Sequence, residues 1–146
     1  MKIAISAAHL KQLALELALH AGKVLFGGGA ADTLLFGDRF PFRYMTDDYG
    51  LRCYAAFPGC SAETEASFET VAFLAGKLNE LGLSHVLVLE SGDGKLARTI
   101  LETSGSDAEI LTLDSLQSVT RAQCESGASY LGIMAANLAV LKTALG

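Results

Sequence analysis

The stretch "HVLVLE", residues 85–90, constrains the fold more than any other part of the sequence. A short apolar run of this kind, closed by a charged residue, is typical of a strand buried on both faces of a sheet. Helical patterns flank it at residues 67–82 and 93–105, and each ends in glycine. Strands that alternate with helices are joined by right-handed crossovers and pair in parallel. We therefore predict an α/β fold with a doubly wound, mostly parallel sheet.

The remaining pattern predicts four strands in all, preceded by an N-terminal helix. The expected strands are residues 32–36, 51–57, 85–90 and 109–114, and the expected helices are residues 6–26, 39–50, 67–82, 93–105 and 127–146. In the helix of residues 67–82, Ser67 is the expected N-cap, and Phe68, Val71, Leu74, Leu78 and Leu81 form one apolar stripe. The 146 residues fit one domain. We divide them into an N-terminal helix with a glycine-rich joint, residues 1–30, and an α/β lobe, residues 31–146.

Composition excludes several classes of partner. The net charge is −5 and no Lys/Arg cluster occurs, so neither nucleic acid nor an anionic membrane is an expected partner. No apolar stretch reaches the length of a membrane span. At the N-terminus, His9, Lys11 and Glu16 interrupt the apolar run too early for a secretory signal, so the chain as written is expected in the cytoplasm. The segment "GGGAAD", residues 27–32, follows a helix and precedes a strand, which is the wrong order for a phosphate-binding loop.

In a doubly wound sheet, functional loops leave the carboxyl ends of the strands. The first such loop is expected after Phe36 and contains Asp38 and Arg39. Asp38 can cap the helix that follows or serve as a ligand or acid/base group. Arg39 and Arg43, placed on one helix face, can clamp an anion or pair with Asp47 or Asp48.

The loop after the second strand, "PGCSAETEAS", contains Cys60 and Glu63. A nucleophilic cysteine needs a histidine or a cationic environment, and this segment contains no histidine. A cysteine enzyme is therefore not expected. Cys53, on the preceding strand, is expected to be a small core residue.

The loop after the third strand, "ESGDGKLA", places Glu90 and Asp93 at the edge of the sheet. Carboxylate oxygens at such a place suit hard or borderline cations. Alternatively, Asp93 caps the next helix and Glu90 pairs with Lys95 or Arg98. Spacing alone leaves these two interpretations open.

Read in order, the loop sequences resemble the C-terminal lobe of the solute-binding proteins that deliver zinc or manganese to ABC importers. The resemblance covers nearly the whole chain and rests on four segments: "LLFGDRFPFRYMTDDYGL", "AAFPGCSAETEASFETVAFLAGKLNELGL", "VLVLESGDGKLARTI" and the ending "GASYLGIMAANLAVLKTALG". Each segment is weak alone, and together they are specific.

The resemblance implies a receptor of two α/β lobes, joined by a long helix, that clasps one metal ion. It places Asp93 at a metal-ligand position of the C-terminal lobe. Where the family usually has "HDAFGYF", this chain has Gly37 or Arg39, so Asp38 is the candidate replacement ligand. Arg39, Cys60, Glu63 and Glu90 are further candidates to face the cleft.

The N-terminal lobe is not encoded here, so the resemblance implies a truncated receptor in which zinc or manganese binds weakly or not at all. It also implies the membrane subunits of an ABC importer as partners, an extracytoplasmic location for the parent family, and no enzymatic activity.

Two alternatives remain. One is a flavodoxin-like enzyme with Asp38, Asp93 and Lys95 around a phosphate or Mg²⁺, although no nucleophile with a base is evident. The other is self-association through the cleft face, with Phe40, Phe42, Tyr44 and Tyr54 forming an exposed aromatic patch.

Overall fold

A computed structural model describes residues 32–58 and 65–146 of the chain. The predicted helix of residues 6–26 and the glycine-rich joint up to residue 31 lie outside these residues. Within them, the chain forms β1 (Thr33–Phe40), α2 (Arg43–Asp48), β2 (Arg52–Pro58), α3 (Phe68–Glu80), β3 (His85–Leu89), α4 (Lys95–Ser104), β4 (Glu109–Leu113), α5 (Arg121–Glu125) and α6 (Tyr130–Leu145).

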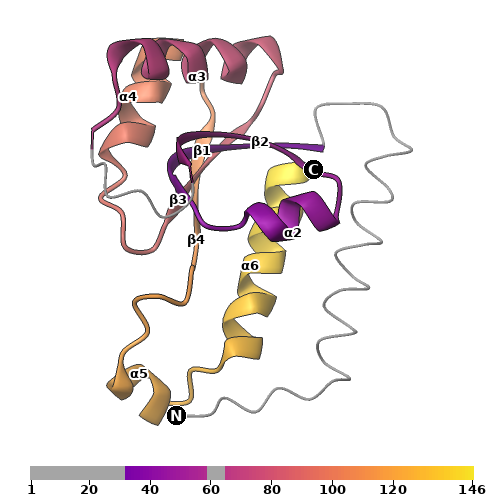
Figure 1. The fold of residues 1–146 in the computed structure, drawn as a ribbon, viewed down its shortest axis with the longest axis vertical. Coiled ribbons are helices and arrows are strands. Elements are labelled where there is room, and N and C mark those ends of the chain that lie inside the picture. The colour runs from indigo at the N-terminus through magenta and orange to yellow at the C-terminus, as the bar shows by residue number, and fades with distance from the viewer. Residues whose placement is uncertain (1–31, 59–64) are drawn as a thin grey trace.

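The predicted parallel α/β sheet is confirmed. The four strands lie in the order β2-β1-β3-β4, and every neighbouring pair is parallel. Helices α3 and α4 cover one face, and α6 with the short α2 covers the other (Figure 1). All four strands therefore present their carboxyl ends at one edge of the sheet.

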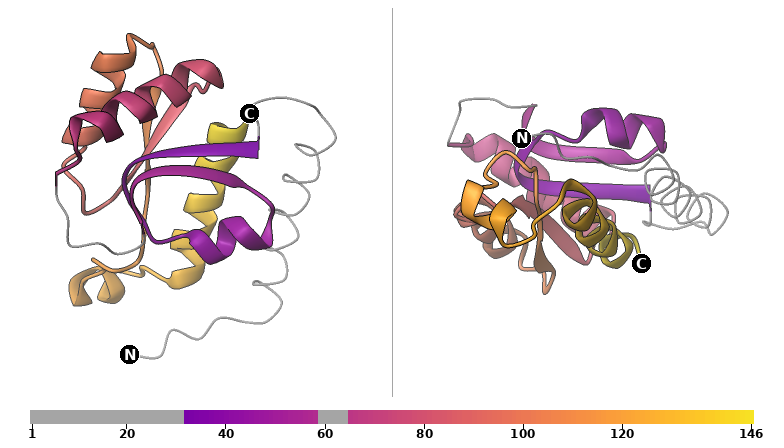
Figure 2. Two further views of the ribbon diagram at one scale, coloured as in Figure 1. Left: turned by 45° about the horizontal axis from the view of Figure 1, so that its top comes forward. Right: turned by 90° about the horizontal axis from the view of Figure 1, so that it is seen from below.

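Two apolar clusters hold the layers together, one on each face. Successive β1 residues alternate between them, as strand geometry requires: Leu34 and Phe36 pack toward α6, and Leu35 packs toward α3 and α4. The β3 residues from Val86 to Leu89 are all buried, which confirms a strand covered on both faces. Figure 2 shows the same layers from two further directions.

Helix boundaries follow the capping signals read from the sequence in most places. Ser67 accepts a hydrogen bond from the Thr70 amide at 3.2 Å and begins α3, as predicted. Gly105 adopts a left-handed conformation at the end of α4. The predicted apolar stripe of α3 is wrong at one position, because Phe68, the first residue of the helix, is 82% exposed.

Two predictions about the region after Phe36 are wrong. Strand β1 continues to Phe40, since a register shift after Phe36 lets Arg39 and Phe40 pair with Phe57 and Pro58. Helix α2 consequently begins only at Arg43, and Arg39 does not share a helix face with it. The predicted pairing of Arg43 with Asp47 is confirmed at 3.6 Å on an exposed face.

Candidate functional site

A hollow of about 600 Å³ opens at the carboxyl edge of the sheet, between β1, the start of α3 and the loop that joins β3 to α4. Asp38, Arg39, Glu65, Asp93 and Lys95 line it. Three of the predicted site residues, Asp38, Arg39 and Asp93, are therefore brought together, although Asp38 and Asp93 are 55 positions apart in the sequence. We call this space the carboxylate hollow.

Asp38 lies in β1 and caps no helix. The N-cap of α2 is Phe42, and no side chain caps it, so the predicted cap is wrong. Instead, one carboxylate oxygen of Asp38 accepts the Arg39 amide at 2.7 Å, and the other accepts the Leu89 amide at 3.2 Å. The side chain thus bridges the irregular end of β1 to the end of β3, and it fixes the base of the hollow.

Two glycines allow this close approach of backbone and side chain. A Cβ added at Gly37 would lie 2.7 Å from both Cα and Cβ of Ala97, because β1 passes directly against α4. A Cβ added at Gly92 would overlap the Asp38 carboxylate. The glycines in "FGDRF" and "SGDGK" are thus required by packing around the hollow.

Asp93 is exposed at the rim of the hollow. One carboxylate oxygen accepts the Lys95 amide at 2.9 Å, so the side chain does support the start of α4, as one of the two interpretations held. The N-cap itself is Gly94, in a left-handed conformation, and the Arg98 guanidinium donates to the Asp93 carbonyl at 2.8 Å. The second carboxylate oxygen accepts no hydrogen bond from the described residues, so capping and cation binding are compatible at Asp93.

Glu90 points toward the loop after β4. Its two oxygens accept from the Ser115 amide, the Ser115 hydroxyl and the Ser118 hydroxyl, each at 2.8 Å. The predicted pairing with Lys95 or Arg98 is therefore wrong. Partial burial opposes ionisation of Glu90, but the three hydrogen bonds outweigh it and lower the pKa of the carboxyl below its ordinary value. The ionised Glu90 side chain therefore links the loop after β3 to the loop after β4 at the carboxyl edge of the sheet.

The other predicted site residues divide into two groups. Arg39 lines the carboxylate hollow and forms no ion pair with the described part of the chain. Cys60 and Glu63 lie outside the described residues. Cys53 packs against the core as predicted, and burial raises the pKa of its thiol to about 11, so the thiol stays protonated.

The hollow offers carboxylates but not a complete metal site. Residues 32–58 and 65–146 contain no group of three or more histidine, cysteine, aspartate or glutamate side chains placed to hold a metal ion. The carboxylates of Asp38 and Asp93 line the hollow together with the cationic side chains of Arg39 and Lys95. This arrangement suits one wall of a site that needs further ligands from elsewhere.

Sequence reasoning missed a buried clamp next to this edge. Asn137 of α6, which is 4% exposed, accepts the Asp114 amide at 2.9 Å and donates to the Asp114 carbonyl at 2.8 Å. The Asp114 carboxylate in turn accepts the Leu116 amide at 2.7 Å, and Leu116 adopts a φ of 62°. The clamp fixes the end of β4 and the Ser115 region that binds Glu90. In the sequence, the one feature that could have indicated this contact is a single asparagine within the apolar helix α6.

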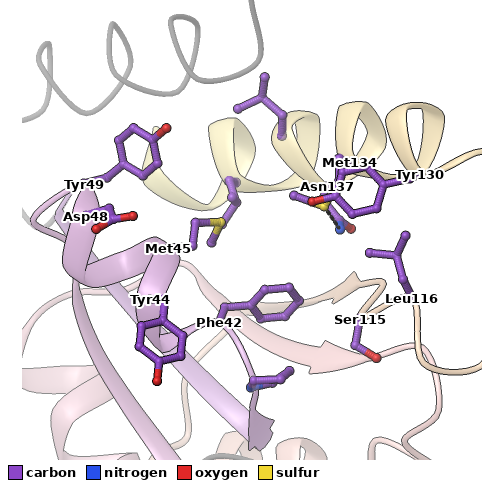
Figure 3. Close-up of a pocket in the computed structure, with 13 residues that line it drawn as sticks. Phe42, Tyr44, Met45, Asp48, Tyr49, Ser115, Leu116, Tyr130, Met134 and Asn137 are labelled. Atoms are coloured by element: carbon purple, nitrogen blue, oxygen red, sulfur yellow. Dashed lines mark hydrogen bonds between the residues drawn. The ribbon is translucent and has the colours of Figure 1, made fainter. Parts of the chain in front are cut away.

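A second, apolar hollow lies on the side of α6. We call it the α2–α6 groove. It has a volume of about 550 Å³, and its main lining residues are Phe42, Met45 and Tyr49 near α2, Leu116 after β4, and Tyr130 and Met134 on α6 (Figure 3).

The predicted aromatic patch does not form. Phe40 and Phe42 are half-buried against Phe36, with ring centroids 5.0 and 6.2 Å away. Tyr54 packs on the other face of the sheet, against Phe73 at 6.0 Å. Tyr44 alone of the four is strongly exposed, at 86%.

The chain matches a known protein family along most of its length. Residues 29–144 match the family described as "Zinc-uptake complex component A periplasmic", ZnuA. The zinc-binding lipoprotein AdcA of Streptococcus pneumoniae is 29% identical over 101 residues, which are 69% of this chain and 20% of that protein. The high-affinity zinc uptake system protein ZnuA of Bacillus subtilis is 28% identical over 104 residues, 71% of this chain and 32% of that protein.

Solved structures show the same fold at lower identity. The periplasmic zinc-binding protein TroA of Treponema pallidum superposes with a TM-score of 0.76 at 19% identity, over 95% of this chain and 49% of that one. The Zn(II)-bound ZnuA-like domain of Streptococcus pneumoniae AdcA superposes with a TM-score of 0.62 at 24% identity, over 93% of this chain and 48% of that one. The chain therefore spans about half of each solved structure and at most 32% of the two relatives. In the described part of the chain, no helix is both long and apolar enough to cross a bilayer.

Proposed function

Because the chain belongs to the periplasmic zinc-uptake component A family, we propose that it forms the C-terminal lobe of a receptor that binds a divalent metal ion and delivers it to an ABC importer. The family match over residues 29–144 carries this proposal. The position of Asp38 and Asp93 supports it, since both line one hollow at the edge of the sheet where ligands of doubly wound folds bind. The receptor works outside the cytoplasm, where the membrane subunits of the importer receive the metal.

Asp93 is the proposed ligand in this lobe. It is exposed, and one of its oxygens accepts no hydrogen bond from the described residues. Both oxygens of Asp38 accept backbone amides, so Asp38 adds negative charge to the hollow and holds it in shape, and each oxygen keeps acceptor capacity for an ion. Neighbours of this kind typically change metal affinity about 10- to 100-fold when they are removed.

One lobe supplies too few ligands for tight binding. Structural and catalytic zinc sites use at least three protein ligands, whereas the carboxylates of Asp38, Glu65 and Asp93 in this hollow are not grouped to hold a metal ion together, and two cationic side chains lie beside them. The opposing lobe of the receptor provides the others. Nitrogen or sulfur ligands there favour zinc, and an oxygen-rich set favours manganese, so the opposing lobe selects the metal.

A two-lobed protein tests the proposal. The full chain is joined behind the N-terminal lobe of the B. subtilis relative, and zinc and manganese binding are measured by titration calorimetry. The Asp93→Ala variant is expected to lose at least about tenfold in affinity, as removal of a ligand or its close support does. The control is Asp107→Ala, an exposed aspartate just before β4 and so at the opposite edge of the sheet. Equal affinity in the parent and Asp93→Ala proteins would refute the role of Asp93.

A further inference from the structure

Arg98 is a cation that binds the proposed metal ligand without neutralising it. It is the fourth residue of α4 and is exposed. The fork of an arginine matches a carboxylate, and the two commonly form an ion pair. In the described part of the chain, however, Arg98 forms no ion pair, and its Nη2 atom donates to the main-chain carbonyl of Asp93 at 2.8 Å. The guanidinium thus binds Asp93 through the backbone and leaves the carboxylate open to a cation.

The backbone on the N-terminal side of Asp93 is held by other contacts. The Gly92 amide donates to the Leu89 carbonyl at 3.0 Å, and the Glu90 side chain binds the loop after β4. These bonds attach the beginning of the β3–α4 loop to the end of the sheet. They do not attach the loop to α4.

On the C-terminal side, Gly94 alone separates Asp93 from α4, which begins at Lys95. Gly94 has a φ of 67°, and glycine has the widest backbone freedom of any residue, so this junction can act as a pivot. A Cβ added at Gly94 would lie 3.2 Å from Nη1 of Arg98, so the guanidinium lies against the pivot while it holds the Asp93 carbonyl. Arg98 therefore bridges the pivot and restricts rotation of Asp93 relative to the helix. The same restriction preserves the 2.9 Å bond between the Asp93 carboxylate and the Lys95 amide.

We propose that Arg98 is a positioning residue for the divalent metal ion: it holds the Asp93 backbone against α4 and so fixes the direction of the Asp93 carboxylate at the rim of the carboxylate hollow. This inference rests on the proposed function, in which Asp93 is the ligand of this lobe. A carboxylate that is held in place before the ion arrives loses less conformational freedom when it binds. Arg98 itself does not line the hollow.

The charge of Arg98 and its positioning role have opposite effects on metal affinity. A positive charge repels a divalent cation, so removal of the charge alone raises the affinity. For an exposed charge several ångströms away in water, the rise is roughly fivefold at most. Loss of a group that orients a metal ligand typically lowers the affinity about 10- to 100-fold. The direction of the change therefore distinguishes a positioning residue from a nearby charge.

The test is Arg98→Met, which removes the donor and the charge but keeps an unbranched side chain that suits a helix. In the two-lobed protein described above, titration calorimetry should show zinc affinity about tenfold below that of the parent. The matched control is Lys95→Met, which removes the same charge from the same helix. The Lys95 side chain lines the hollow and forms no ion pair with the described residues, so this variant should bind zinc up to roughly fivefold more tightly.

Hydrogen exchange of the full chain without metal gives a second readout. In Arg98→Met the Lys95 amide, which donates to the Asp93 carboxylate, should exchange faster with solvent, while the amides of Val86–Leu89 in β3 keep their parent rates. An unchanged rate at Lys95, or zinc affinity that rises in both Met variants, would overturn the inference. If Asp93→Ala lowers zinc affinity and Arg98→Met does not, the inference fails and the proposed function stands. If neither lowers it, both fail.

Discussion

Replacement of Asn137 by alanine should destabilise the lobe more than its size suggests. The side chain is almost fully buried and binds both the amide and the carbonyl of Asp114, at 2.9 and 2.8 Å. Alanine removes the partner of both groups, and the amide and carbonyl of one residue cannot take the place of these bonds by pairing with each other. An unsatisfied buried polar group costs about 1–3 kcal/mol. Asp114 is only half-buried, so the lower part of that range applies to each group, and the expected total is about 2–3 kcal/mol.

Urea unfolding followed by far-ultraviolet circular dichroism measures this loss as a lower midpoint at an unchanged slope. Asn79→Ala is the matched control: the Asn79 side chain donates one hydrogen bond, to the Ser104 carbonyl at 2.8 Å, and it is exposed. Its expected cost is at most about 1 kcal/mol. If Asn137→Ala were no more destabilising than Asn79→Ala, the clamp would not support the end of β4 as described.

Three further predictions concern the carboxyl edge. Gly37→Ala should cost about 1–3 kcal/mol, because the new methyl group meets the backbone of Ala97; an unchanged urea midpoint would contradict the close approach. Gly92→Ala should be destabilising in the parent protein but much less so in an Asp38→Ala background, and strictly additive unfolding free energies would argue against their contact. Hydrogen bonding lowers the pKa of Glu90 in the folded protein below its ordinary value of 4.5. The ionised Glu90 side chain therefore stabilises the fold fully above pH 4.5. This stabilisation is lost as the pH falls through the lower pKa of the folded protein. The difference in unfolding free energy between the parent and Glu90→Gln proteins should therefore shrink from pH 7 to pH 3, and a constant difference would contradict this assignment.

The layers of the fold could be predicted from the sequence because hydrophobic periodicity reports burial directly. The run at residues 85–89 is buried on both faces, and the capping roles of Ser67 and Gly105 are local chemistry. The end of β1 could not be predicted in the same way. Residues Gly37–Phe40 look like a loop because they contain glycine and charges, yet pairing with β2 and contact with α4 keep them in the strand.

For the site, the sequence allowed a prediction of its location but not of the contacts within it. The rule that ligands bind at the carboxyl edge placed Asp38 and Asp93 together. The partners of Glu90 were not predictable, because Ser115 and Ser118 are 25 and 28 residues away and reach it only when β3 and β4 pair. Asn137 stands out in the sequence as an asparagine within an apolar helix, but for the same reason its partner Asp114 was not predictable.

Manganese titration of the isotopically labelled full chain, followed by amide NMR signals, tests the central claim most directly. Paramagnetic Mn²⁺ broadens the signals of amides near its binding place even when binding is weak. The account predicts that the amides of Arg39, Asp93, Gly94 and Lys95 broaden first, and that Asp93→Ala abolishes this preference. Broadening that spreads evenly over exposed acidic positions such as Asp107, or that begins there, would show that the carboxylate hollow is not where this lobe meets a divalent metal ion.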